Sequence, residues 1–207
     1  MLATEIPIFP LQNVVLFPGV FLPLHVFESR YRAMMLDVLA GNRMIGIVLQ
    51  KPGWNQDRGG RAATYGVGCA GLVTHVEQLD DGRYNIILRG VEKFRIDGER
   101  EGKPYRIAQV APLAEYLSDA DHEALRQQRQ QLERLLTTAQ TPDLPFPVTL
   151  SDEEVVNALA QYLEFDANER QALLEQPGVA ERCRALIDLL EMKSMLSGHP
   201  PDRGLVH

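Results

Sequence analysis

Cysteine is scarce in this sequence: the 207 residues include only Cys69 and Cys183, which are far apart and stand in no motif. A disulfide framework or a cysteine-based zinc site would need more cysteines at closer spacing. We therefore expect both to be reduced, apolar core residues. Cys69 with His75 and His25 could in principle gather a metal, but three separate strand residues are the simpler interpretation. We expect no metal and no cofactor.

Long apolar runs are also missing. No segment approaches the ~20 residues that a membrane-spanning helix needs, and residues 1–5 carry no basic segment followed by an apolar one. This start is unlike a signal peptide. The sequence therefore predicts a cytoplasmic protein with no membrane partner.

Catalytic motifs are absent as well. ATP hydrolysis needs a glycine-rich loop that ends in Lys-Ser/Thr, and the nearest stretch, residues 98–104, is one residue short and has Pro104 in place of the hydroxyl. Neither a Gly-x-Ser-x-Gly elbow nor a serine–lysine protease module is evident. The acidic groups at 80–81 and 152–154 are more simply a turn and a helix start than an acid–base pair. We expect no enzyme activity and no catalytic residue.

Charge is distributed unevenly around the formal net charge of −7. Residues 1–117 hold 13 Lys/Arg against 12 Asp/Glu, whereas residues 118–196 hold 7 against 15. The acidic half should repel a phosphate backbone, so nucleic acid is a disfavoured partner. The near-neutral half leaves room for a local basic patch.

The first part of the chain, residues 1–117, is expected to form a β domain. Short apolar runs joined by tight turns, including an Asp-Gly turn at 80–82, indicate a closed or nearly closed barrel. The run 20–27 is apolar on both faces, so we expect a strand buried on both sides, with Pro23 at an edge, a bulge or a strand end. A polar turn is expected at 97–103.

One helix is expected within this β domain. Apolar residues recur at helical spacing between Tyr31 and Leu39, which predicts a buried helical face. Gly41 is placed to close the helix in a left-handed conformation.

The second part, residues 118–196, is expected to be a helical bundle. Its apolar residues follow a helical period, and serine or aspartate followed three residues later by an acid marks the helix starts. Residues 197–207 lack apolar periodicity and are expected to form a disordered tail. The helix-start pairs are Ser118/Asp121, Ser151/Glu154 and Asp166/Glu169.

An ordered set of short motifs covers most of residues 5–113 and resembles the N-terminal domain family of Lon-type ATP-dependent proteases. Each motif is weak alone, but their order and spacing together are specific. Residues 150–190 look like the helical extension of the same family, more loosely. The motifs are Pro7–Gly19, Leu22–Leu24, Phe27–Tyr31, Gly46–Val48, Tyr65–Ala70, Arg89–Ile96 and Pro104–Arg106.

The resemblance implies an α+β fold: a PUA-like β pseudo-barrel with one inserted helix, followed by a C-terminal α-helical bundle. In full Lon proteases this region helps to select polypeptides for degradation, and the domain also occurs alone. We therefore expect a non-catalytic module that binds unfolded or extended polypeptides. It would act as an adaptor in protein quality control, with a protease or chaperone as a partner. Ser29 stands where the family often has proline, and we expect it to cap the helix.

RNA binding is the alternative, because PUA-like folds resemble RNA-binding domains. The acidic helical half argues against it. The arginines that could supply a basic patch are Arg58, Arg61, Arg83, Arg89, Arg95 and Arg106.

Candidate polypeptide contacts come from exposed-looking aromatic and polar residues. Trp54 stands in a glycine-rich loop, where it either contacts a partner or packs back on the barrel. Phe17 and Pro18 lie in the 12–20 loop. Aromatic anchors on loops often dominate interfaces. Glu28, Arg30 and Tyr31 open the first helix. They could form the rim of a groove, or they could be structural, with Glu28 favouring the helix N-terminus and Tyr31 in the core.

Overall fold

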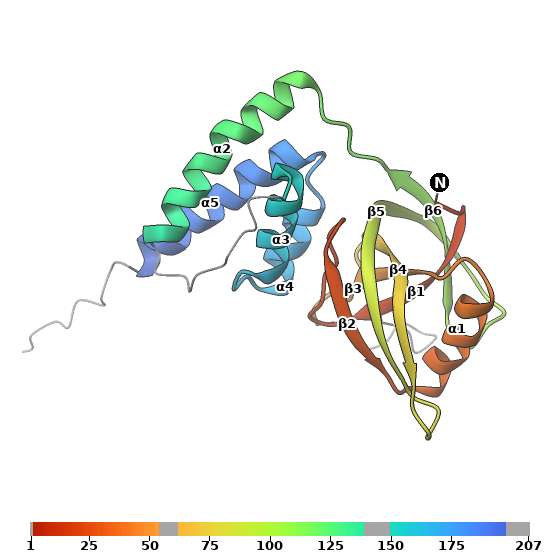
Figure 1. The fold of residues 1–207 in the computed structure, drawn as a ribbon. Coiled ribbons are helices and arrows are strands. Elements are labelled where there is room, and N and C mark those ends of the chain that lie inside the picture. Colours follow the sequence, from red (N-terminus) through yellow and green to blue (C-terminus); the bar gives the residue numbers. More distant parts are fainter. Residues whose placement is uncertain (1, 54–61, 139–149, 198–207) are drawn as a thin grey trace, which may run out of the picture. The chain divides into compact units, whose positions relative to one another are not determined.

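The computed structural model describes residues 2–53, 62–138 and 150–197 (Figure 1). The chain divides into two compact units: a barrel unit, Met1–Ala114 with Asn157–Glu175, and a helical unit, Glu115–Val156 with Gln176–His207. The barrel unit thus takes in a segment from the second half of the chain. That 1–117 and 118–196 fold as separate domains stays a prediction, and 197–207 lie almost wholly outside the described residues.

A six-stranded mixed sheet forms the barrel unit, with strand order β2-β5-β4-β3-β1-β6. Because β5 also pairs with β6, five strands close into a ring, and β2 lies beside β6 on the same edge of β5. The expected α+β pseudo-barrel with one inserted helix is confirmed. The elements are β1 (Glu5–Leu11), β2 (Phe21–Val26), α1 (Ser29–Ala40), β3 (Met44–Leu49), β4 (Val67–Gln78), β5 (Tyr84–Arg100) and β6 (Arg106–Leu113).

The aromatic side chain of Phe94 fills the middle of the barrel that these five strands form. A Cβ atom added to Gly46 or Gly68 would lie only 2.8 Å from the tip of the Phe94 ring, so β3 and β4 can approach the ring only where they carry glycine. Phe94 itself is fully buried. The core around it consists of Ile6, Ile8, Val48, Ala70, Phe94, Ala108 and Val110.

The 12–20 loop crosses β5 at another glycine. The amide of Gly19 donates to the carbonyl of Gly90 at 2.9 Å, and the amide of Gly90 donates to the carbonyl of Val20 at 2.8 Å. A Cβ on Gly90 would lie 2.0 Å from the carbonyl oxygen of Phe17. Only glycine allows so close a crossing.

Helix α1 begins and ends differently from expectation. Its N-cap is Glu28, which makes no side-chain capping bond, so the prediction that Ser29 caps the helix is wrong. Ser29 is the first helical residue, a position where proline is favoured. Gly41 is not left-handed (φ −110°); instead Arg43 takes the positive φ of 60° and donates its amide to Val38.

Two strands also differ from expectation. β5 runs unbroken to Arg100 because a register shift between Ile96 and Gly98 lets it bend while staying paired with β6, so the turn expected at 97–103 starts later. β2 is buried on one face only, whereas burial on both was expected. Pro23 does lie in an outer strand of the sheet, as predicted.

Part of the second half of the chain packs within the barrel unit. This segment comprises the end of α3 (Asp152–Tyr162) and α4 (Ala167–Leu174), and it buries Leu163 and Phe165. A capping box between Asp166 and Glu169 starts α4, as the sequence predicts. Side-chain hydrogen bonds to the strands and loops join Gln161 to Phe17, Tyr162 to Phe21, Asn168 to Tyr65 and Gln171 to Val67.

In the helical unit, α2 (Asp119–Thr138) and α5 (Val179–Ser197) lie side by side (Figure 1). The Gln131 amide donates to the Glu191 carboxylate at 2.9 Å between them. Ser118 and Asp121 form the predicted capping interaction at the start of α2. None of the described helices is both long and apolar enough to cross a membrane.

A buried ion pair lies in the helical unit. The Arg182 side chain is 0% exposed, and its guanidinium donates to both carboxylate oxygens of Glu115, with Nη1 at 3.2 Å from Oε2. If one partner were removed, the other charge would be left buried without a counterion, which would strongly destabilise the folded state.

The barrel core can be tested by shortening its central side chain. Phe94→Ala should lower the free energy of unfolding by about 3–5 kcal/mol, because it leaves a cavity that the surrounding strands cannot fill. Phe27→Ala, at a side chain that is 61% exposed, is the control and should change it by less than about 0.5 kcal/mol. Urea unfolding measures both, and equal losses would contradict the assignment of the core.

The buried ion pair can be tested by removing one partner. Arg182→Leu should cost about 3–5 kcal/mol because it leaves the Glu115 carboxylate buried without its guanidinium. Arg184→Leu, at an exposed arginine on the same helix, should be nearly neutral. Adding Glu115→Leu to Arg182→Leu should restore most of the thermal stability; no recovery in the double variant would show that the pair is not the source of the loss.

Candidate functional site

The residues predicted at the start of α1 form one cluster. Arg30 pairs with Glu28 at 2.8 Å, and its guanidinium lies 4.7 Å from the centre of the Tyr31 ring. Tyr31 is buried against Phe9, with ring centres 4.1 Å apart, and burial raises its pKa. Glu28 and Arg30 therefore offer a polar surface, while Tyr31 belongs to the core.

The other predicted contact residues offer little described surface. The Phe17 side chain is 0% exposed and packs into the core. Pro18 beside it is half-buried, and Trp54 lies outside the described residues. As polypeptide contacts, these residues stay predictions.

The sheet presents a surface that the sequence had not singled out, which we call the β2 face. It consists of the outward side chains of β2 with those of β5 and β4 beside it, and their register places Phe21, Arg89 and Leu72 in one row and Pro23, Ile87 and His75 in the next. Phe21 is 50% exposed. The residues of the β2 face are Phe21, Pro23, His25, Leu72, His75, Asn85, Ile87 and Arg89.

A shallow cavity of about 360 Å³ lies in the β2 face. Its walls are mostly apolar, with two imidazoles and one amide at the rim, a composition common in sites that accept an apolar group and orient it through a few polar contacts. The lining residues are Pro23, Leu24, His25, His75, Asn85, Ile86 and Ile87.

One end of the β2 face carries a chain of polar contacts. The Asn85 amide nitrogen donates to Glu77 at 2.7 Å, so the Asn85 amide oxygen faces His25 Nδ1, also at 2.7 Å, and accepts a hydrogen bond from it. His25 Nε2 is then the acceptor for Arg83 at 3.2 Å, and Arg83 pairs with Asp81 at 2.6 Å. The charged groups at this end of the face are thus already matched with one another.

The free edge of β2 is a poor template for a further strand. The carbonyl of Val20 points toward β5 and accepts a hydrogen bond from the Gly90 amide. The carbonyl of Phe21 points the other way and accepts a hydrogen bond from the Tyr162 hydroxyl at 3.0 Å. Antiparallel alternation therefore places the backbone groups of Phe21, Pro23 and His25 on the outer edge. Pro23 has no N–H to donate, and the Phe21 carbonyl is occupied, so a ligand is better accommodated on the face than at the edge.

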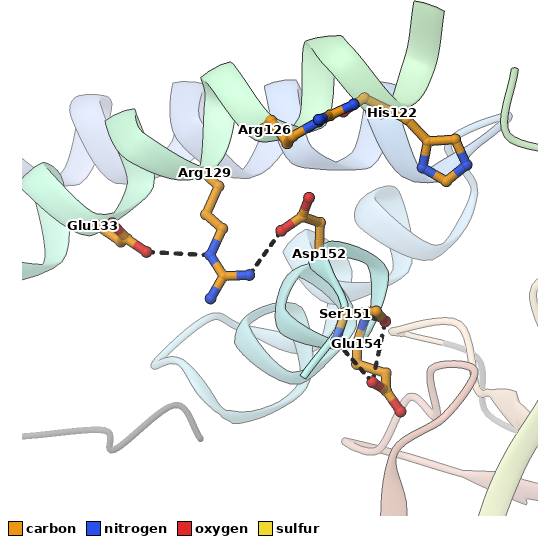
Figure 2. A network of polar contacts seen from close by, with 7 residues as sticks. All are labelled: His122, Arg126, Arg129, Glu133, Ser151, Asp152 and Glu154. Carbon is orange, nitrogen blue, oxygen red and sulfur yellow. Dashed lines mark hydrogen bonds and ion pairs between the residues drawn. The ribbon is translucent and has the colours of Figure 1, made fainter. Parts of the chain in front are cut away.

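The acidic start of α3 has a structural role (Figure 2). Ser151 and Glu154 form the predicted capping box, with Glu154 Oε2 accepting from the Ser151 amide at 3.0 Å. Asp152 pairs with Arg129 at 2.7 Å, and Arg129 also contacts Glu133. These contacts support the helix-start interpretation of residues 152–154.

Reactive or metal-binding groups do not gather in the described part of the chain. No group of three or more His, Cys, Asp and Glu side chains there could hold a metal ion. Burial raises the pKa of Cys183 to about 12, so its thiol is a poor nucleophile. Residues 98–104 form the end of β5 and the turn into β6, whereas a phosphate-binding loop leads into a helix.

The arginines considered for RNA binding do not gather into a free basic patch. Arg83, Arg95 and Arg106 each pair with a carboxylate, and positions 58 and 61 lie outside the described residues. Arg89 is exposed on the β2 face.

The sequence contained one signal for the β2 face. Phe21, Pro23, His25 and Phe27 alternate along the chain, and proline and histidine are less typical of a buried face than the residues between them. The proline and the histidine at alternate positions therefore indicate which side of β2 faces outward.

The chain matches the family model described as the ATP-dependent protease La (LON) substrate-binding domain over residues 5–192. Among curated proteins it is 30% identical to Lon protease 2 of Syntrophobacter fumaroxidans over 181 residues, and 26% identical to the Lon protease of Flavobacterium johnsoniae over 190 residues. These alignments cover 85% and 87% of this chain but only 23% of each protease.

Solved structures agree with the fold. The N-terminal domain of Mycobacterium avium complex Lon protease superposes with a TM-score of 0.70 at 17% identity, covering 90% of this chain and 98% of that one. A Lon N-terminal domain protein from Xanthomonas campestris gives 0.60 at 23% identity, covering 96% and 100%.

The carboxyl of Glu153 gives a pH-dependent test of the helical unit. Burial, and then the nearby Glu115, raise its pKa in the folded protein. The folded state therefore holds this proton more tightly, and stability is lost as pH rises through the raised pKa. Glu153→Gln should raise the melting temperature at pH 7 and give a smaller gain at pH 4. An equal gain at both pH values, or the same pattern in the exposed control Glu164→Gln, would contradict this account.

Proposed function

Because the chain belongs to the family of the ATP-dependent protease La (LON) substrate-binding domain, we propose that it binds unfolded or extended polypeptides in the cytoplasm through the β2 face. It does so without catalysing a reaction. The chain spans about a quarter of the curated relatives that it matches, so the ATPase and protease activities of those proteins are not attributed to it. A protease or chaperone that receives the bound polypeptide is part of the proposal, with this protein as an adaptor in protein quality control.

The observation that carries the proposal is the row of exposed apolar side chains on paired strands. Phe21 and Leu72 flank β5, and Pro23 and Ile87 line the neighbouring cavity. Contiguous apolar groups exposed on a sheet favour association, because contact removes their surface from water. An aromatic anchor in such a patch contributes strongly to binding.

The supporting sheet makes the site rigid. β5 is held by β2, β4 and β6 along its length, so the face changes little when a ligand arrives and the ordering cost falls on the ligand. Affinities of ~µM or weaker are ordinary when a disordered segment must be ordered on binding. The exposed pair Glu28–Arg30, with Pro18 and Trp54, remains a set of secondary candidate contacts.

The test uses a permanently unfolded probe, a reduced and alkylated protein carrying a fluorophore. The double variant Phe21→Ser, Ile87→Ser should weaken binding at least about tenfold, because it removes an anchor and a wall of the cavity. Tyr116→Ser removes an exposed aromatic side chain of the helical unit and should leave affinity unchanged. Fluorescence anisotropy measures all three proteins.

Two checks complete this experiment. Circular dichroism must show that the double variant is folded, which the exposure of Phe21 makes the expected result. Full retention of affinity in the folded double variant would remove the β2 face as the binding site.

A further inference from the structure

Arg89 occupies a singular position within the β2 face. It lies on β5 directly opposite Phe21 on β2 and Leu72 on β4, and residues paired in this way share one side of the sheet. Two positions earlier on the same strand is Ile87, on the same side. An exposed guanidinium therefore stands among apolar side chains on three sides.

The charge of Arg89 is not matched by its surroundings. Asp81 is paired with Arg83, and Glu77 accepts a hydrogen bond from Asn85. Within the described residues, the exposed side chain of Arg89 makes no hydrogen bond or ion pair. It differs in this from Arg95 on the same strand, which pairs with Asp97 at 2.9 Å.

A polypeptide that covers Phe21 and Leu72 must also cover the guanidinium between them. Removing an unpaired cation from water is costly, and a carboxylate brought by the ligand offsets that cost. The planar guanidinium can donate two parallel hydrogen bonds to one carboxylate, which adds geometric selectivity to the charge attraction.

We propose that Arg89 makes the β2 face selective for extended segments in which one acidic residue stands among apolar residues. The inference rests on the proposed function and specifies its substrate class. Side chains two positions apart in an extended segment face the same way at a spacing of about 6.7 Å. This spacing equals that between Ile87 and Arg89 on β5. The preferred pattern is therefore an acid with an apolar residue two positions away on one or both sides.

A single carboxylate suits this site better than a phosphate backbone. Nucleic acids are bound by several cations that follow successive phosphates. Arg83, which lies near the β2 face, is already bonded to Asp81 and His25. Arg89 is therefore the available cation in the row of Phe21 and Leu72.

The test compares two fluorescent peptides that differ in one side chain, which carries a carboxylate in one peptide and a neutral amide in the other. Both carry the pattern apolar-x-acid-x-apolar, one with glutamate at the centre and one with glutamine. Wild-type protein should bind the glutamate peptide about tenfold more tightly. Arg89→Gln should bind both equally, near the wild-type affinity for the glutamine peptide, and Arg89→Lys should keep part of the preference. Arg95→Gln is the matched control and should keep all of it.

The outcomes separate this inference from the function on which it rests. Suppose that the wild type binds the two peptides equally and that the double variant Phe21→Ser, Ile87→Ser loses binding. This result overturns the role of Arg89 and leaves the polypeptide site in place. Unchanged binding of the unfolded probe by that double variant overturns the site itself. Binding of single-stranded RNA that weakens in Arg89→Gln would assign the residue to nucleic acid and overturn the inference.

Discussion

The close contact of the Phe94 ring with Gly46 and Gly68 is the constraint on which the barrel unit depends. It brings the inner sides of β3 and β4 against the Phe94 side chain, and a larger residue at either glycine would disturb this packing. Farther along β5, Leu88 is buried in the interior, so Ile87 and Arg89 lie outside, because strand side chains alternate. The composition of the β2 face thus follows from the packing of β5 in the interior.

The same construction determines which groups the β2 face offers to a ligand. At one end of this face the polar groups are engaged in hydrogen bonds, in the chain from Glu77 through Asn85 and His25 to Arg83. The outer edge of β2 is blunted by Pro23 and by the Tyr162 hydroxyl. What remains available is apolar surface, a shallow cavity, the imidazole of His75 and the guanidinium of Arg89. These are the groups through which we propose that this member of the Lon substrate-binding domain family selects a ligand by shape and charge.

Several local features of the sequence predicted local structure, although the cap expected at Ser29 and the left-handed Gly41 did not form. The Asp-Gly hairpin appears with Gly82 at φ 79°, and the capping pairs at 118, 151 and 166 all form. Features that depend on distant partners could not be predicted this way. The alternation in β2 does not reveal that one of its faces is exposed among the described residues. Likewise, nothing near Gln171 in the sequence indicates its hydrogen bond to Val67. Arg89 opens the motif Arg89–Ile96, but the sequence does not show that its side chain lacks an ion pair. That follows from the fold, in which Asp81 pairs with Arg83 and Glu77 accepts a hydrogen bond from Asn85. An aromatic residue in a loop predicts an exposed contact at Phe17, whereas the crossing at Gly90 buries it.

The most direct test of the central claim is to map the binding surface by nuclear magnetic resonance. Amide signals of the ¹⁵N-labelled protein would be followed while an unlabelled unfolded polypeptide is added. The account predicts that the largest shifts fall on β2 and on the facing parts of β4 and β5, around Phe21, Leu72 and Ile87. Shifts confined to α2 and α5, with these strands unaffected, would contradict it.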